Sequence, residues 1–179
     1  MRWRAAVAML LVIAFTAGCA TVSLIDTIES LLRQALELLN AKRYDEALVK
    51  LTEVIRRDPT QWKAYLYGAQ AYLGKADFRQ ALTMLTDGIS RATDPEARAQ
   101  LTQTLLDGGR QALARADYRA AVGMLAQYVR QDPTSVSGYL DLGRAYWAAG
   151  DRSDALGAFR RVLELAPGNE EARRFLLGR

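Results

Sequence analysis

Histidine is absent from this 179-residue chain, and cysteine occurs once, as Cys19. A single cysteine cannot form a disulfide within the chain, and the shortage of soft ligands argues against a zinc or other transition-metal site. Nucleophilic catalysis with a histidine base is excluded. A Walker-type phosphate loop is missing too, because Asp107-Gly108-Gly109 is not followed by lysine and a hydroxyl residue. We therefore expect a non-enzymatic protein with no cofactor, no metal and no small-molecule substrate.

A large excess of charge of one sign is also lacking. The chain has 24 basic and 20 acidic side chains, and without Arg2 and Arg4 the balance is 22 to 20. Such a small surplus gives no reason to expect binding to nucleic acid. Half of the residues are hydrophobic and a quarter are charged, which is typical of a chain that folds.

The longest apolar run is short and lies at the start of the chain. It spans residues 5–15, follows Arg2 and Arg4, and is followed by Thr16-Ala17-Gly18-Cys19. A membrane-spanning helix needs about 20 apolar residues, so the run favours a cleaved secretory signal over a retained anchor. We expect residues 1–18 to be a signal peptide.

The residues before Cys19 resemble the lipobox of bacterial lipoproteins, with Thr16 in place of the usual leucine. The resemblance implies cleavage before Cys19, which would be lipidated and would hold the chain at a membrane. By the same resemblance, Ala20 instead of aspartate implies the outer membrane, facing the periplasm, rather than the inner membrane. Residues 19–25 would be the lipidated cysteine and a short tether of about 20 Å at most.

The rest of the chain repeats with a period of 34 residues. Alanine recurs at Ala47, Ala81, Ala121 and Ala155, and a bulky apolar residue follows four positions after each. A period of this length is typical of stacked helical units that cannot bury their apolar faces alone. Aspartate, asparagine, threonine or proline occupies the breaks, as expected where helices start and end, and Asp26 is the candidate cap of the first helix.

The fourth unit has the fullest motif, and its residues are Tyr139, Leu142-Gly143, Tyr146, Gly150-Asp151, Ala155, Phe159 and Pro167. These residues resemble the tetratricopeptide repeat (TPR) family. Departures are Gly68 and Gly108 in place of leucine, and Arg152 in place of an aromatic residue. The resemblance implies an all-α fold, a right-handed superhelical solenoid of four helix hairpins in residues 26–168 with a C-terminal capping helix. The expected units are 28–61, 62–101, 102–135 and 136–168, and the capping helix is 169–179.

One step of the repeat is irregular. Ala81 and Ala121 are 40 residues apart, so the second unit contains a six-residue insertion. Asp94-Pro95-Glu96 has the form of an N-cap, a first-turn proline and a first-turn acid. We expect one long helix over residues 95–114; the alternative is a bend between two pairs of repeats.

The first helix of each unit carries a second line of residues at i, i+4 and i+7, beside the line that packs in the hairpin. In the family these positions face the concave groove, where extended or helical peptides bind. We expect the groove to expose an apolar surface for a segment of another protein, although such leucines can instead pack against the next unit. The candidate binding residues are Leu32, Leu36, Leu39, Leu66, Gln70, Leu73, Leu106, Arg110, Leu113, Leu140, Arg144 and Trp147.

These features together predict a membrane-anchored scaffold for protein–protein interaction. Leucines occupy the row where relatives that clamp a carboxylate-ended peptide have lysine, asparagine and arginine, so such a clamp is not expected. Small repeat lipoproteins of this plan resemble the pilotins of type IV pilus secretins, which implies an assembly factor for an envelope complex. Two alternatives are an adaptor that regulates cell-wall hydrolases and a structural subunit of a polysaccharide or protein export machine.

Overall fold

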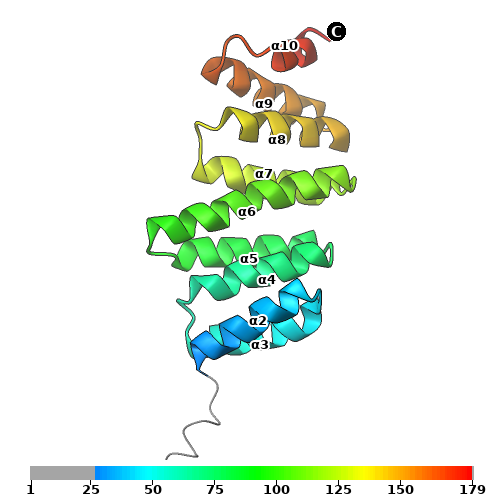
Figure 1. The fold of residues 1–179 in the computed structure, drawn as a ribbon. Coiled ribbons are helices and arrows are strands. Elements are labelled where there is room, and N and C mark those ends of the chain that lie inside the picture. The colour runs from blue at the N-terminus through cyan, green and yellow to red at the C-terminus, as the bar shows by residue number, and fades with distance from the viewer. Residues whose placement is uncertain (1–26, 179) are drawn as a thin grey trace, which may run out of the picture.

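The computed structural model describes residues 27–178, which form nine α-helices and no β-strand (Figure 1). Each helix packs on the next in chain order, and the successive pairs form four antiparallel hairpins with one helix left at the C-terminal end. The expected all-α solenoid is confirmed. The helices are α2 (Ile28–Asn40), α3 (Tyr44–Arg57), α4 (Trp62–Gly74), α5 (Phe78–Arg91), α6 (Pro95–Ala114), α7 (Tyr118–Gln131), α8 (Val136–Ala149), α9 (Arg152–Leu165) and α10 (Glu170–Leu177).

Small residues bring the two helices of each hairpin close together. Ala35 and Ala69 are completely buried at one position of the repeat, and glycine takes the same position in the third and fourth hairpins. A Cβ atom on Gly109 would lie 2.6 Å from the Leu125 side chain, and one on Gly143 would lie 2.6 Å from Phe159. These distances are too short for any larger residue, so the glycines set the helix separation.

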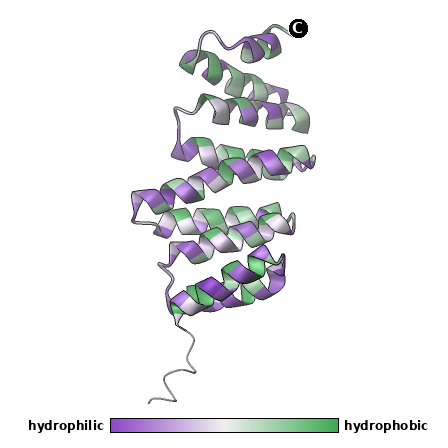
Figure 2. Cartoon of the chain, viewed as in Figure 1, coloured by the Kyte–Doolittle hydropathy of each residue, from purple (hydrophilic) through white to green (hydrophobic). Residues whose placement is uncertain are grey.

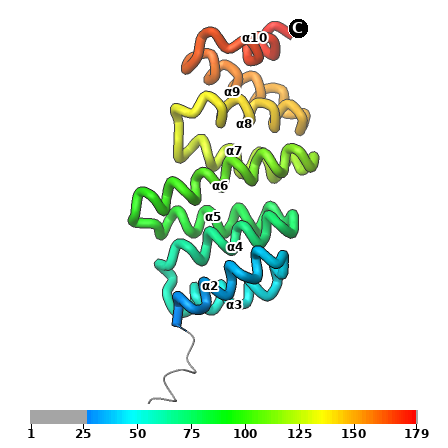
Figure 3. Tube along the Cα trace, viewed as in Figure 1, coloured from blue at the N-terminus to red at the C-terminus, as the bar shows by residue number. Residues whose placement is uncertain are grey.

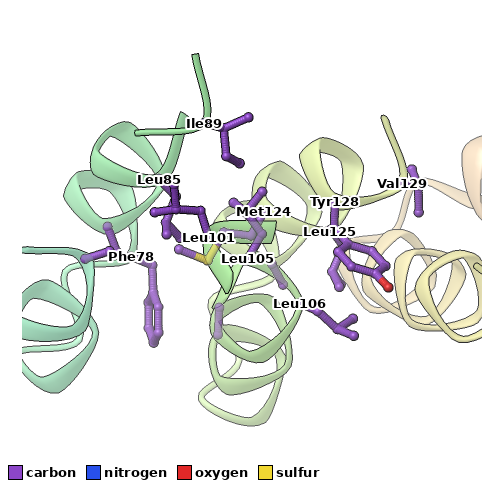
Figure 4. Close-up of a cluster of buried hydrophobic side chains, with 14 of the residues drawn as sticks. Phe78, Leu85, Ile89, Leu101, Leu105, Leu106, Met124, Leu125, Tyr128 and Val129 are labelled. Atoms are coloured by element: carbon purple, nitrogen blue, oxygen red, sulfur yellow. The ribbon is translucent and has the colours of Figure 1, made fainter. Parts of the chain in front are cut away.

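The buried apolar side chains form three clusters along the stack, and half-buried residues such as Ile55 and Tyr139 each pack against two of them. A large central cluster extends from α4 to α9 and includes Leu85, Leu101, Leu105 and Leu125 (Figure 4). Smaller clusters lie in the first hairpin and around α9 and α10. Apolar and polar residues alternate along each helix (Figure 2), as expected for helices that bury one face between neighbours.

Helix α6 is the longest of the helices in residues 27–178, and its N-terminal turns extend past the ends of its neighbours (Figure 1). It begins at Pro95 and ends at Ala114, as the sequence predicts. The Asp94 side chain caps it by accepting hydrogen bonds from the backbone N–H groups of Glu96 and Ala97. The expected border between residues 101 and 102 falls inside this helix, so the six additional residues lengthen the first helix of the third hairpin.

The two unusual glycines, Gly68 and Gly108, are matched by methionines on the facing helix. A Cβ atom on Gly68 would lie 3.3 Å from Met84, and one on Gly108 would lie 2.9 Å from Met124. In the fourth hairpin the same two positions hold Leu142 and Ala158. The hairpins therefore exchange a large residue on one helix for a large residue on the other, which preserves the core volume.

The turn between the two helices of each hairpin contains one residue with a positive φ. This residue is Lys42, Ala76 or Ala116 in the first three hairpins, with φ of 58–59°, and Gly150 in the fourth, with φ of 92°. Only the last of these turns has the residue type that adopts this conformation without strain.

The two ends of the stack differ in polarity. At the N-terminal end, Gln34 and Lys50 occupy the positions that hold glycine and methionine in the second and third hairpins, and Arg43 pairs with Glu46 beside them. Thr27 caps α2 by accepting from the Ser30 N–H. The cap predicted at Asp26 is therefore wrong, because the helix begins one residue later.

At the C-terminal end, α10 lies across the last hairpin (Figure 3). Phe175 stacks on Phe159, with ring centroids 4.2 Å apart, and Ala172 is fully buried. The outer side of α10 carries Arg173 and Arg174, which are exposed. The helix thus covers the apolar end of the stack, as the sequence predicts for a capping helix.

Candidate protein-binding face

The first helices of the hairpins, α2, α4, α6 and α8, form one continuous face, which we call the inner face. Each contacts the next first helix directly, in addition to its partner in the hairpin. Because the face is built from equivalent positions of the repeat, its side chains form three rows that cross the helices. The rows begin at Leu32, Leu36 and Leu39 of α2.

The row that begins at Leu32 is mostly buried. Leu32, Leu66 and Leu106 have exposed fractions of 4–9%, and Leu140 is half-buried against the C-terminal cluster. Leu106 lies in the central cluster with Leu105 and Leu125 (Figure 4). The prediction that this row is exposed is wrong for its first three members, because each fills the space between successive hairpins.

The row that begins at Leu36 is the open one. Leu36 is 39% exposed, and Gln70 is exposed at the equivalent position of α4. The side chains of Arg110 and Arg144 continue the row and are 46% and 40% exposed. The surface that a partner can reach therefore changes from apolar at α2 to basic and hydrogen-bonding at α6 and α8.

The row that begins at Leu39 is half-buried along its whole length. Leu73 and Leu113 pack against the central cluster. Trp147 meets the ring of Phe175 edge-on, with centroids 5.1 Å apart, and the Arg152 guanidinium lies 3.8 Å from the indole centroid. The indole ring of Trp147 is thus partly occupied by contacts within the protein. Arg152, which stands where the repeat motif has an aromatic residue, contacts this ring through a cation–π interaction.

Four charged side chains connect the third hairpin, the fourth hairpin and α10. Arg110 Nε donates to Asp141 Oδ2 at 2.6 Å, and Arg144 Nη1 donates to Asp141 Oδ1 at 2.8 Å. Arg144 also donates through Nε and Nη2 to the two carboxylate oxygens of Glu171, at 2.6 and 2.5 Å. We call this group the arginine–carboxylate cluster. It holds two of the four open-row side chains in fixed positions.

The electrostatics of the cluster agree with this geometry. The hydrogen bonds from Arg144 lower the pKa of Glu171, and the same bonds raise the pKa of Arg144. Asp141 is only 5% exposed, and both of its oxygens accept from arginine. The two guanidinium partners thus hold this buried carboxylate rigidly in place.

The sequence pattern pointed to the two arginines but not to Asp141 and Glu171. The i, i+3 spacing of Asp141 and Arg144 is a signal that could have been used. Nothing local indicates the contact of Arg110 with Asp141, 31 residues away, or of Arg144 with Glu171, 27 residues away.

Cys19 and the proposed leader and tether lie outside the described residues. Within residues 27–178, none of the helices combines the length and apolar character needed to cross a membrane. The same part of the chain contains no cluster of histidine, cysteine, aspartate or glutamate that could hold a metal ion.

The sequence profile of the tetratricopeptide repeat family matches residues 38–106 and 112–177, which together make up more than half of the chain. The chain belongs to the tetratricopeptide repeat family. The helix hairpins of this family form scaffolds for protein–protein interaction, and this TPR protein is assigned the same general role. No curated protein matches the chain.

Several solved TPR structures are similar to this one. MamA from Desulfovibrio magneticus RS-1, residues 41 to the end, is 19% identical with a TM-score of 0.52, and the match covers 85% of this chain and 82% of that one. A double mutant of MamA RS-1 gives the same identity and coverage with a TM-score of 0.53. YrrB, described as a TPR protein with an unusual peptide-binding site, is 16% identical with a TM-score of 0.52, covering 89% of this chain and 79% of that one. Identities this low establish only the shared fold.

Proposed function

We propose that this TPR protein is a non-catalytic, lipid-anchored assembly factor of the bacterial envelope. Its inner face binds a segment of another envelope protein, in the manner of the pilotins that assist type IV pilus secretins. Cys19 carries the lipid and holds the protein at the outer membrane, on the periplasmic side. The observation that carries the binding role is the open row of Leu36, Gln70, Arg110 and Arg144.

This row is suited to binding because two of its four side chains, Arg110 and Arg144, are already held in place by hydrogen bonds. The neighbouring rows are packed into the stack, so the open row is supported from below by a rigid core. Preorganised side chains lose little entropy on binding. A peptide-binding site on YrrB, a protein of the same fold, supports the use of such a scaffold for peptide recognition.

The partner can be captured in cells with a photo-crosslinking amino acid. We place p-benzoylphenylalanine at Gln70 on the inner face and, as a matched control, at Gln80, which is exposed on α5 of the same hairpin. We expect a single crosslinked envelope protein from position 70 and none from position 80. Adding Leu36→Asp should remove the crosslink, since a carboxylate would replace an exposed apolar contact.

The identity of the crosslinked protein decides between the candidate roles. A secretin subunit supports the pilotin-like role, whereas a cell-wall hydrolase or an export-machine subunit supports one of the two alternatives. Equal crosslinking from positions 70 and 80 would show that the inner face is not the binding surface.

The anchor is tested separately by Cys19→Ser. We expect the variant to lose incorporation of radiolabelled palmitate and to move from the outer-membrane fraction to the soluble periplasmic fraction. An unchanged distribution between fractions would contradict the lipoprotein assignment without affecting the binding role.

A further inference from the structure

Arg110, in the middle of the open row, uses only one of its five N–H donors within the part of the molecule that the structure describes. It donates Nε–H to Asp141, and its Nη1 and Nη2 groups have no hydrogen-bond partner within residues 27–178. A guanidinium has five N–H donors, so four remain available on a side chain that is nearly half exposed. Gln70, one helix away in the same row, adds an exposed amide.

The four charges of the arginine–carboxylate cluster sum to zero. Arg110 and Arg144 are compensated by Asp141 and Glu171, at contact distances of 2.5–2.8 Å. A carboxylate from a partner would give the cluster a net negative charge next to the buried Asp141. A neutral acceptor would satisfy the free donors without that repulsion, and the most abundant neutral acceptor in a protein is the backbone carbonyl.

An extended segment offers such carbonyls, whereas a helix does not. All but the last four carbonyl groups of an α-helix are bonded within the helix. An amphipathic partner helix would also need several exposed apolar contacts. The open row provides one, Leu36, because its other members are the polar residues Gln70, Arg110 and Arg144.

We propose that the arginine–carboxylate cluster and Gln70 form a donor site for the backbone carbonyls of an extended, non-acidic partner segment, with Leu36 receiving an apolar side chain at one end. The proposal rests on the function proposed above and specifies the chemistry of its ligand. The path from α2 to α6 covers two interhelical steps of about 8–10 Å each. At about 3.3 Å per residue, this path needs roughly six residues of extended chain.

Asp141 is a positioning residue in this arrangement. It does not face the ligand, but it fixes Arg110 and Arg144 and cancels one of their charges. Replacing it by asparagine gives the cluster a net positive charge. The preferred ligand should then change from neutral to acidic, which a purely structural role would not cause.

The test uses a 12-residue peptide selected from a random phage-displayed library against the full chain in detergent. The peptide is synthesised unchanged, with single backbone esters that weaken one carbonyl acceptor each, and with one central glutamate. We expect Arg110→Met to weaken the unchanged peptide about tenfold to a hundredfold, as for the loss of charged hydrogen bonds. Arg119→Met, at an exposed position on α7, is the matched control and should leave the affinity unchanged.

Two further results are expected from the same peptides. At least one ester should weaken binding, and the bound peptide should give the strong sequential Hα–HN transferred NOEs of an extended chain. The glutamate version should bind the unaltered protein no better than the parent peptide, but should bind Asp141→Asn about tenfold better than the parent does.

Helical NOEs, or a preference of the unaltered protein for the glutamate peptide, would overturn the inference. So would binding that is lost in Leu36→Asp but unaffected in Arg110→Met, although the inner face would then remain the binding surface. Selected peptides that bind both variants normally would show that the inner face is not used, and the proposed function would fail with the inference.

Discussion

Each hairpin turn contains one residue with a positive φ, and the type of residue at this position affects the free energy of unfolding. Ala116 has a positive φ of 59°, and Gly150, its counterpart in the fourth hairpin, has a φ of 92°. A residue with a Cβ atom loses about 1–2 kcal/mol in this conformation. Glycine avoids that loss but gains about 0.4–1 kcal/mol of freedom in the unfolded chain.

We therefore expect Ala116→Gly to raise the free energy of unfolding by about 0.5–1 kcal/mol, and Gly150→Ala to lower it. Urea unfolding followed by circular dichroism measures both. Ala99→Gly, at an exposed position inside α6, is the control and should lower stability by about 1 kcal/mol. A stabilising effect of Ala99→Gly, or none of Ala116→Gly, would show that turn strain is not the cause.

The pairing of Gly68 with Met84 gives a second prediction at this scale. Gly68→Leu should lower the free energy of unfolding by about 1–3 kcal/mol, because the new side chain overlaps Met84. Adding Met84→Ala creates the combination found naturally at Leu142 and Ala158. The double variant should regain the free energy of unfolding that Gly68→Leu loses. A double-mutant cycle of unfolding free energies gives the coupling; additive effects would contradict the volume exchange.

Individual side chains also show where sequence reasoning ends. The spacing of Leu32, Leu36 and Leu39 correctly identified one line along a helix. It could not tell which residue of that line the next hairpin covers, because burial depends on how far neighbouring helices approach. Leu32 became core and Leu36 remained exposed, although their sequence environments are alike.

Helix α10 is held to the last hairpin partly by a contact that depends on pH, the ion pair between Glu171 and Arg144. The Arg144 guanidinium lowers the pKa of Glu171 by donating to both carboxylate oxygens. The contact therefore stabilises α10 above the pKa of unfolded glutamate, about 4.3, and is lost as the pH falls through the lower folded-state value. We expect α10 to loosen in acid before the hairpins unfold.

The indole N–H resonance of Trp147 reports this step, because its ring contacts Phe175 of α10. The resonance should shift as the pH falls below about 4.3, while helicity remains. In Glu171→Gln the shift should be present at neutral pH and nearly independent of acid. Glu164→Gln, which removes an exposed pair with Arg161 on α9, should behave like the unaltered protein.

Helix α6 was predictable at this scale because its boundary residues act locally. Asp94 and Pro95 specify a helix start, and six additional residues need no other change to lengthen a helix. The arginine–carboxylate cluster was not predictable, since it joins α6, α8 and α10 through the three-dimensional stack. Local signals fixed the elements, and only their packing created the cluster.

Across the whole molecule, the three core clusters predict an uneven stability. The central cluster connects α4 to α9, whereas the first hairpin and α10 each have neighbours on one side only within residues 27–178. Stability in a repeat array is roughly a sum of unit and interface terms. Native-state hydrogen exchange should thus show roughly tenfold lower protection in α2, α3 and α10 than in α5, α6 and α7. Uniform protection would indicate a single cooperative unit.

The polar residues Gln34 and Lys50 at the N-terminal end mean that the array can be lengthened at its other end only. A designer who wants a longer protein can remove α10 and graft further hairpins onto the apolar surface left by Phe159 and Ala155. The same graft before α2 would trap an amide and an ammonium group without water. Additional hairpins, whether designed or gained by tandem duplication, are thus accommodated at the C-terminal end of the array and not before α2.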